Sequence, residues 1–240
     1  MKQRLFAFAI IALALFNPSC KPKNAPSGKI ISKEIPVSEY SVISSALPAN
    51  IIYEQTDGPA YLKLDVDQSV LDKLDINVKD SVLQLNFKSG ISLNLHTEKW
   101  VVRTNSKMLK LVSITGAGNF KLKHLSGAKR LDVRMEGAGN FEADSLHCVS
   151  FALTVSGVGN AKVKGTAEAA AYNLAGVGNV EADNFHVKSL RVFLSGAGNA
   201  DVSASDYLFV GLKGAGNVTY KTKPKKLETD IQGVGKVTQK

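Results

Sequence analysis

A four-residue pattern recurs through the second half of this 240-residue chain: Gly, then Ala or Val, then Gly, then a polar residue. Its seven copies begin at Gly116, Gly137, Gly157, Gly176, Gly196, Gly214 and Gly233, at spacings of 21, 20, 19, 20, 18 and 19 residues. Self-similarity near 20 residues is typical of a solenoid, in which each repeat buries its apolar face against its neighbours. This spacing constrains the fold more than any other feature.

Apolar residues alternate with other residues on both sides of each copy. Before the second copy they are Leu131, Val133 and Met135, and after the first copy they are Phe120 and Leu122. A period of two indicates strands. We therefore predict an all-β fold, a parallel β-solenoid with about 20 residues per coil. Each coil is expected to have two strands and a corner, in places with a short third strand.

The composition of the turn fits this prediction. Two glycines permit positive φ and a close backbone approach, and the Ala or Val between them can point inward. Successive coils should lie about 4.8 Å apart, so the residue that ends each copy can form a ladder of amide hydrogen bonds along the axis. The predicted structural ladder consists of Asn119, Asn140, Asn160, Asn179, Asn199 and Asn217. Lys236 replaces Asn in the last copy, as expected of a terminal repeat.

The N-terminus has the features of an export signal. Lys2 and Arg4 precede an apolar run over residues 5–16, which is too short to span a bilayer. The run ends at a Ser-Cys junction that resembles a bacterial lipoprotein signal. We therefore predict a signal peptide over residues 1–19 and lipidation of Cys20, which would anchor the protein without a transmembrane helix. Ordinary cleavage that leaves Cys20 free is the alternative.

The rest of the chain is predicted to form a flexible tether and one domain. Residues 20–29 are rich in Pro, Gly, Ser and Lys and have no apolar period. Residues 30–108 lack the glycine pattern but keep the strand period, so we expect irregular β-rich coils that cap the repeats of residues 109–240. A separate small β-domain is the alternative for the first part. Cys148 has no partner within the chain and is expected at a buried or corner position.

These features together resemble the head-GIN-domain proteins, a family of putative auto-transporter adhesins common in Bacteroidetes. The resemblance rests on the lipoprotein-type start, the irregular β half and the serial Gly-Ala-Gly-Asn or Gly-Val-Gly-Asn copies, and it covers nearly all of the mature chain. It implies a right-handed parallel β-helix and an adhesin-like role. It carries over no catalytic residues, and fold does not determine function.

Charged residues follow each turn, and their signs alternate from coil to coil. One predicted row consists of Lys121, Glu142, Lys162 and Glu181. The row beside it consists of Lys123, Asp144, Lys164 and Asp183. Each opposite-charge neighbour pair contributes about 0.2–1 kcal/mol, so stacking alone accounts for the pattern. Lys162 between two glutamates would keep both ionised, which is unfavourable for the general acid of a glycoside-cleaving site. A pectin-lyase-like carbohydrate-active enzyme is nevertheless kept as an alternative function.

The histidines do not suggest a metal site. His147 and His186 share an offset from the turn, but they lie two coils apart with Ala167 between them, beyond the reach of one ion bound at about 2.0–2.1 Å. The glycine pattern also lacks the aspartates of the calcium-binding nonapeptide and the helix and Lys of a phosphate loop. We expect no metal and no cofactor.

One strand face is nearly uncharged. The outward positions before the turn hold small polar residues and two aromatic side chains, which suits contact with a partner. The candidate binding face consists of Thr154, Ser156, Asn173, Phe193, Ser195 and Phe209. Coverage of this face by the tether or by the N-terminal segment is the alternative.

The net charge of +9 favours an anionic partner. Anionic glycan, lipopolysaccharide, or an envelope or host protein fits an exported chain, whereas nucleic acid does not. The densest basic cluster is expected to be solvated and to prevent another chain from pairing with the C-terminal edge of the sheet. It consists of Lys221, Lys223, Lys225 and Lys226. We predict a non-catalytic protein of the cell envelope, anchored by lipid to the outer membrane, whose β-helix displays a binding face for glycan or protein. A purely structural envelope component is a further alternative.

Overall fold

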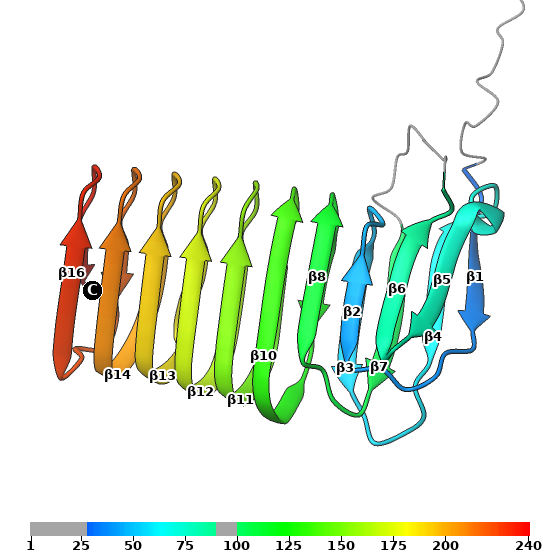
Figure 1. Ribbon diagram of the computed structural model, residues 1–240, viewed down its shortest axis with the longest axis horizontal. Helices are drawn as coiled ribbons and strands as arrows, with labels where there is room; N and C mark the ends of the chain where they lie inside the picture. Colours follow the sequence, from blue (N-terminus) through cyan, green and yellow to red (C-terminus); the bar gives the residue numbers. More distant parts are fainter. Residues whose placement is uncertain (1–27, 90–99) are drawn as a thin grey trace, which may run out of the picture.

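The computed structural model describes residues 28–89 and 100–240. The predicted signal peptide, Cys20 and nearly all of the predicted tether lie outside the described residues. The same is true of His96 and of a strand expected around Ile91, Leu93 and Leu95. The described strands join into a single 17-stranded sheet that coils around one apolar core (Figure 1).

The N-terminal strands are short. They are β1 Ile30–Ile35, β2 Val42–Ser45, β3 Asn50–Gln55, β4 Leu62–Asp67, β5 Leu74–Lys79, β6 Val82–Phe87, β7 Val101–Ser106, β8 Leu111–Gly116 and β9 Asn119–Leu122, with one 3-10 turn, η1 Leu71–Lys73, before β5. The later strands are β10 Leu125–Gly137, β11 Phe141–Val155, β12 Ala161–Leu174, β13 Val180–Leu194, β14 Ala200–Leu212, β15 Val218–Tyr220, β16 Lys226–Ile231 and β17 Val237–Gln239.

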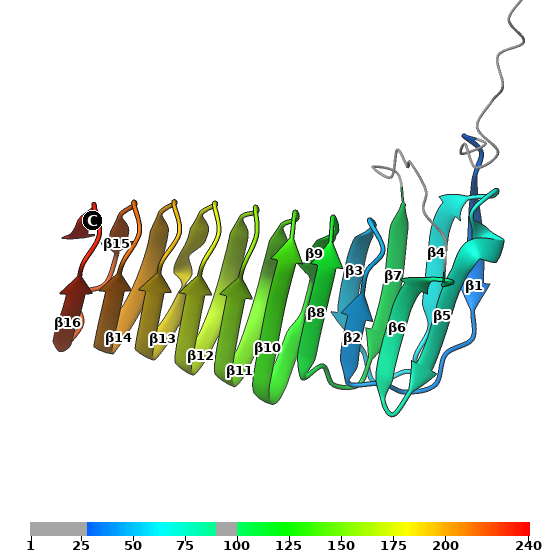
Figure 2. The same cartoon turned by 45° about the horizontal axis from the view of Figure 1, so that its top comes forward.

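In the repeat half, one long strand forms most of a coil. β11, β12, β13 and β14 each run from just after one Gly-x-Gly-Asn turn to just before the next, and neighbours pair in parallel (Figure 2). The predicted strands of a coil are therefore continuous. At the corner of each coil the strand bends through an irregularity in its hydrogen-bond pairing, such as the register shift between Ala143 and Leu146. The chain therefore turns the corner without a loop.

The core is built from rows of inward side chains in register. One row contains Val133, Leu153, Tyr172, Val192 and Val210, each opposite the next and each buried. Phe120 and Phe141 stack in the same way, with ring centroids 6.2 Å apart. Because each repeat supplies the same alternation, every added coil extends one apolar core, as the period of two predicts.

The turns stack so closely that glycine is obligatory within them. A Cβ added to Gly157 or Gly159 would collide with the carbonyl oxygen of Gly137 or Gly139 in the preceding turn. The prediction that the residue between the glycines points inward is wrong. Val158 is 60 % exposed. The backbones of successive turns pair with one another, as Val158 does with Ala138 and Val177, and fill the inside of the turn.

The N-terminal coils do not follow one another in chain order. β2 and β3 form a coil that pairs with β8 and β9 on one side and with β6 and β7 on the other. The chain therefore leaves this coil, builds the end of the solenoid, returns through β6 and β7, and continues past its own first coil (Figure 1). The first coil is held between two later ones.

The end of the solenoid next to the N-terminal strands is closed by antiparallel pairs. β4 pairs with β1 and β7, and β5 pairs with β6, all antiparallel. Arg103 on β7 forms an ion pair with Asp65 on β4 across this end. The change from parallel to antiparallel pairing stops the regular stack, as expected for a capped solenoid end.

The predicted fold class is confirmed: the chain is an all-β solenoid with about 20 residues per coil and a more irregular N-terminal half. Across residues 28–89 and 100–240, the structure contains no helix with the length and apolar character needed to cross a membrane.

Candidate binding face

The asparagines of the turns lie in one row along the solenoid. The Oδ1 of Asn140 accepts a hydrogen bond from the backbone N–H of Asn160 at 3.0 Å and another from its Nδ2 at 3.3 Å. The same pair of bonds links every consecutive member from Asn119 to Asn217. At the last turn, the backbone N–H of Lys236 donates to the Oδ1 of Asn217 at 3.1 Å. Lys236 ends the row, because its side chain has no acceptor for a further hydrogen bond.

The row has one member that the glycine pattern did not reveal. Asn119 donates its Nδ2 to the Oδ1 of Asn50 at 2.7 Å, and the two residues are register partners on β9 and β3. The turn before Asn50, Ala46 to Ala49, contains no glycine and so does not match the repeat pattern. The only sequence feature that marks Asn50 as a member of the row is its position before a strand with alternating apolar residues. All seven asparagine side chains are exposed or partly exposed, so their amides are hydrogen-bonded at the surface and not within the core.

The first predicted charge row forms as expected. Lys121, Glu142, Lys162 and Glu181 are consecutive register partners. Lys121 bridges Glu142 at 3.2 Å, and Lys162 bridges Glu181 at 3.1 Å. The second predicted row is wrong at its end, because the corner irregularity places Asn184 and not Asp183 opposite Lys164.

The carboxylates in these rows are neutralised by cations. Asp144 and Glu142 share the ammonium of Lys121, and their hydrogen bonds raise its pKa. Asp183 lies 3.6 Å from the Nζ of Lys240. Glu181 is paired in the same way with Lys162. Each of these carboxylates therefore lies beside a lysine in an ion-paired surface ladder.

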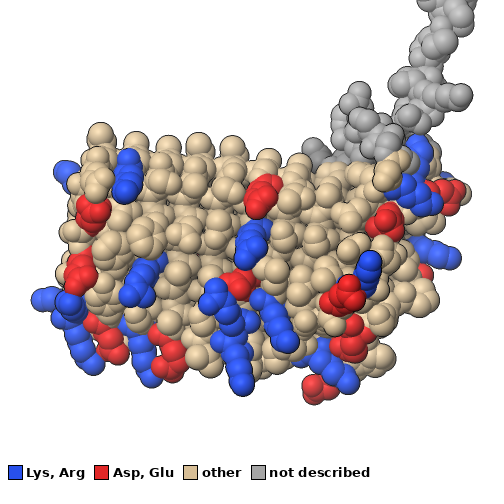
Figure 3. Space-filling view, viewed as in Figure 1, with Lys and Arg blue, Asp and Glu red and all other residues tan. Residues whose placement is uncertain are grey.

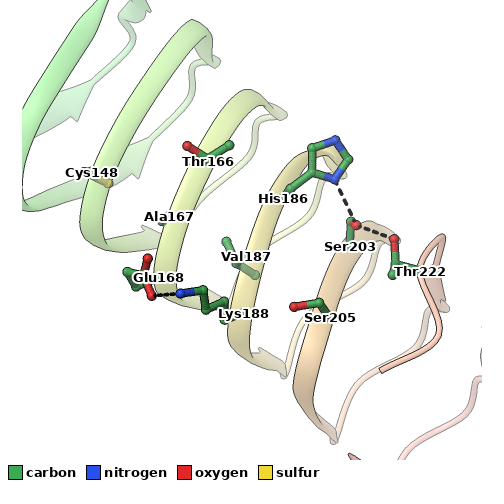
Figure 4. A pocket seen from close by; sticks show the side chains of 10 residues that line it. All are labelled: Cys148, Thr166, Ala167, Glu168, His186, Val187, Lys188, Ser203, Ser205 and Thr222. Carbon is green, nitrogen blue, oxygen red and sulfur yellow. Dashed lines mark hydrogen bonds and ion pairs between the residues drawn. The ribbon is translucent and has the colours of Figure 1, made fainter. Parts of the chain in front are cut away.

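A shallow groove of about 320 Å³ runs across the corner side of β11, β12, β13 and β14 (Figure 4). It is lined by Cys148, Thr166, Ala167, Glu168, His186, Val187, Lys188, Ser203, Ser205 and Thr222. The Nδ1 of His186 lies 3.3 Å from the Oγ of Ser203, which lies 2.9 Å from the Oγ1 of Thr222. These hydroxyls form a short chain along the axis.

The groove does not contain the arrangement of a hydrolase. Ser203 is 2 % exposed, so its hydroxyl is poorly placed to attack a substrate, and Glu168 forms an ion pair with Lys188 at 2.6 Å. The histidine therefore has a hydroxyl partner without the carboxylate that orients a catalytic imidazole. Within the described residues, no group of three or more His, Cys, Asp or Glu is arranged to hold a metal ion.

The sequence expectation for the residue between the two histidines is wrong. Thr166, and not Ala167, lies between His147 and His186, because the corner irregularity shifts the count from the turn. His147 instead places its Nδ1 2.9 Å from the Thr166 hydroxyl. Cys148 is a free, half-buried thiol, and burial raises its pKa to about 11. It is therefore a neutral and weakly reactive thiol at neutral pH.

The candidate binding face lies on the side of the solenoid that precedes the turns. Thr154, Asn173 and Phe193 occupy one register row, which continues to Gly211. Phe209 lies in the adjacent row opposite Arg191. Ser156 and Ser195 occupy the position next to their turns, where the backbone N–H of each donates to the preceding coil. The six residues thus share one side of the sheet.

Two phenylalanines cover a glycine on this face. The rings of Phe193 and Phe209 have centroids 5.3 Å apart, and a Cβ added to Gly211 would meet them at 3.0 and 3.3 Å. Phe193 is nevertheless 44 % exposed. The missing side chain of Gly211 leaves room for the two rings, which are inclined at 48° to each other, to pack over the strand.

Beside the phenylalanines lies an aromatic and charged cluster. The guanidinium of Arg191 lies 5.7 Å from the ring centroid of Tyr207. The hydroxyl of Tyr207 donates to Glu228 at 2.6 Å, and this hydrogen bond raises the pKa of Tyr207. Lys226 is ion-paired with the same carboxylate at 2.6 Å. The cluster fixes the orientation of Tyr207 at the edge of the face.

Between this cluster and β10 the face is flat and free of charge. Its outward residues, on β11 and β12 or directly after them, are Ser150, Ala152, Thr154, Ser156, Ala169, Ala171, Asn173 and Ala175. Figure 3 shows this uncharged surface in the upper part of the stack, bounded by charged side chains on β10 and along the lower edge. A flat platform of small side chains, bordered by aromatic rings, offers contact area to a large ligand without a pocket for a small one.

The fold defines a class of protein, a parallel β-solenoid with a flat, uncharged face. Residues 39–224 match the family model described as "Putative auto-transporter adhesin, head GIN domain". The match covers most of the chain, so the protein belongs to this family, which confirms the resemblance drawn from the repeats.

Several solved structures share this fold. A putative adhesin from Bacteroides fragilis is 28 % identical, with a TM-score of 0.84 over 90 % of this chain and 99 % of that one. A putative adhesin from Parabacteroides merdae is 23 % identical, with a TM-score of 0.70 over 90 % and 98 %. A putative lipid binding protein from Parabacteroides distasonis is 22 % identical, with a TM-score of 0.70 over the same shares. A comparison with curated proteins found no match.

Proposed function

We propose that the protein is a non-catalytic, adhesin-like component of the bacterial cell envelope that binds a glycan or a protein through the face on β11 to β14. The observation that carries the proposal is the pair of the exposed Phe193 and the half-buried Phe209 beside an uncharged platform. Membership of the adhesin family supports the same conclusion. Exposed aromatic side chains next to small polar residues are typical of interface centres.

The proposed ligand is extended and carries some negative charge. A flat platform several coils long favours a polymer or a protein surface over a small metabolite, because it buries little of a compact ligand. Arg191, held against Tyr207, offers a cation at the edge of the platform for an anionic sugar or a carboxylate. Anionic glycan and lipopolysaccharide are therefore the first ligands to test.

The test is a glycan array probed with the mature domain and two variants. Phe193→Ser should abolish binding to the retained glycans, while Val158→Ser, which removes another exposed apolar side chain on the turns, should preserve it. Equal binding by both variants and the unchanged protein would place recognition elsewhere. A thermal melt of each variant separates loss of the face from loss of the fold.

We further propose that Cys20 carries a lipid anchor that holds the domain at the outer membrane. The support is the charged start, the short apolar run and the Ser-Cys junction of the sequence. Anchoring would place the binding face at the envelope without any transmembrane helix. Cys20→Ala should move the protein from the membrane fraction to the soluble fraction of cells, and unchanged partitioning would refute the anchor.

A further inference from the structure

The first part of β10 has an open edge. β10 pairs with β8 from Asp132 to Gly137, where the N–H of Asp132 donates to the carbonyl of Lys110 at 2.9 Å. From Leu125 to Arg130, however, it pairs with β11 alone. The corresponding part of the next coils lies between two strands. An edge of this kind presents main-chain N–H and C=O groups that can pair with another chain.

Gln55 closes one end of this edge. Its Oε1 accepts from the N–H of Ser126 at 2.8 Å, and its Nε2 donates to the carbonyl of Ser126 at 3.2 Å and of Lys107 at 2.8 Å. Gly127 lies in the irregularity between Leu125 and Ala128, with a φ of 72°. The extended part of the open edge therefore runs from Ala128 to Arg130, which is long enough for a short segment to pair with it.

A cavity of about 490 Å³ lies beside this edge, where β10 and the segment before β8 diverge. It is lined by Met108, Lys110, Leu111, Gly127, Ala128, Lys129, Arg130 and Asp132. Met108 packs against the core and Ala128 is 2 % exposed, so the floor of the cavity is apolar. Its volume falls in the range of sites that hold an organic ligand or a few residues of a peptide, about 300–1,000 Å³.

The rim of the cavity carries uncompensated positive charge. Arg130 is neutralised by Asp132, with an Nη2 to Oδ1 distance of 2.8 Å. Lys110 and Lys129 are exposed and form no ion pair with any residue that the structure describes. Basic side chains are visible at the lower ends of β8 and β10 in Figure 3. An apolar floor with two available ammonium groups is complementary to a ligand that carries both apolar and negative groups.

We propose that this edge and cavity form a docking site for an extended peptide in which acidic and apolar residues alternate. The peptide would add a strand beside Ala128–Arg130 through main-chain hydrogen bonds. Its side chains alternate, so the apolar ones enter the cavity while the acidic ones reach Lys110 and Lys129. β11 and β12 separate this site from Phe193 and Phe209 on β13 and β14, so it does not depend on the function proposed for that face.

The test uses the full mature domain and a fluorescein-labelled hexapeptide of alternating Glu and Val. Saturable binding is expected, with NMR amide shifts concentrated at Gly127, Ala128 and Lys129. The same peptide with alternate amides N-methylated should bind at least about tenfold more weakly, since strand addition needs its N–H groups. A Lys-Val hexapeptide should not bind.

Two double variants with the same charge change separate the site from general electrostatics. Lys110→Glu with Lys129→Glu should weaken binding at least about tenfold, while Lys164→Glu with Lys213→Glu should leave it within about twofold. Equal weakening by both, shifts elsewhere on the protein, or no saturable binding would overturn the proposal. Binding of dodecanoate in this cavity without binding of the peptide would also overturn it, in favour of an amphiphile site.

Discussion

The side-chain amide of Asn119 donates a 2.7 Å hydrogen bond to the Oδ1 of Asn50, 69 positions earlier in the chain. This bond joins the first regular turn of the repeats to a turn of the irregular half. The asparagine row therefore runs without a break across the point where the chain order of the coils changes. The N-terminal strands are thereby part of the same stack that carries the candidate binding face.

The asparagine row is expected to stabilise the stack. Asn160→Ala removes the acceptor for the N–H and Nδ2 of Asn179 and the donor to Asn140. Because these groups are exposed, water replaces part of the loss, and we expect a decrease of about 0.5–1.5 kcal/mol in the free energy of unfolding. Urea unfolding followed by circular dichroism measures it.

The matched control is Asn173→Ala on the same strand-and-turn unit. Asn173 is also exposed, but it lies on the flat face and makes no side-chain hydrogen bond to the residues that the structure describes. Its replacement should change stability by less than about 0.5 kcal/mol. Equal costs for the two variants would mean that the row has no structural role.

The close stacking of the turns makes Gly159 irreplaceable. In Gly159→Ala the new methyl group would overlap the carbonyl of Gly139, and that carbonyl belongs to a backbone held from both sides. We expect a loss of about 3 kcal/mol or more, the upper part of the range for overpacking. Gly58→Ala, where the nearest atom lies 3.8 Å from the added Cβ, is the control and should be nearly neutral. A thermal midpoint for Gly159→Ala close to that of the unchanged protein would contradict the observed turn stacking.

The sequence predicted the repeat half well because each repeat obeys the same local rules. The alternation around Val133 and the glycines at Gly157 and Gly159 report constraints that act between adjacent coils, and adjacent coils are about 20 residues apart in the chain. The pairing of β3 with β9 depends on contacts between residues 69 positions apart, such as Asn50 and Asn119, whose turns share no glycine pattern. No local rule could predict the order of those coils.

The candidate sites were predictable in part, for a similar reason. Phe193 and Phe209 could be assigned to one face because a regular strand separates each from its turn. Beyond a corner, counting from the turn fails, and Thr166 rather than Ala167 came to lie between His147 and His186. The cavity beside β10 arises where this strand and the segment before β8 diverge, which is a property of the packing and leaves no pattern in the sequence.

The half-buried thiol of Cys148 should make stability depend on alkaline pH. Its folded pKa, about 11, lies above the value for an exposed thiol, so the unfolded chain ionises first as pH rises. The contribution is present below the unfolded pKa and is lost as pH rises towards 11. The free energy of unfolding of the natural chain should therefore fall more steeply between about pH 8.5 and the folded pKa than that of Cys148→Ala. Parallel curves would show that the thiol is not buried in solution.

The charge row gives a test of the register itself. Lys162 lies opposite both Glu142 and Glu181 and is ion-paired with Glu181 at 3.1 Å. Lys162→Glu would place three carboxylates in consecutive coils of one row. Because the row is half-exposed, we expect a cost of up to about 1 kcal/mol at low ionic strength.

Added salt should remove most of that cost, since the Debye length falls from about 30 Å at 0.01 M to about 3 Å at 1 M. Combining Lys162→Glu with Glu142→Lys restores one favourable neighbour pair but sets the new lysine opposite Lys121 and the new glutamate opposite Glu181. The double variant should therefore recover part of the stability and not all of it. Urea unfolding of both variants at 0.01 M and 1 M NaCl measures these differences. A cost that salt does not change would mean that these residues do not face one another, and full recovery in the double variant would mean that Glu142 and Lys162 interact with each other alone.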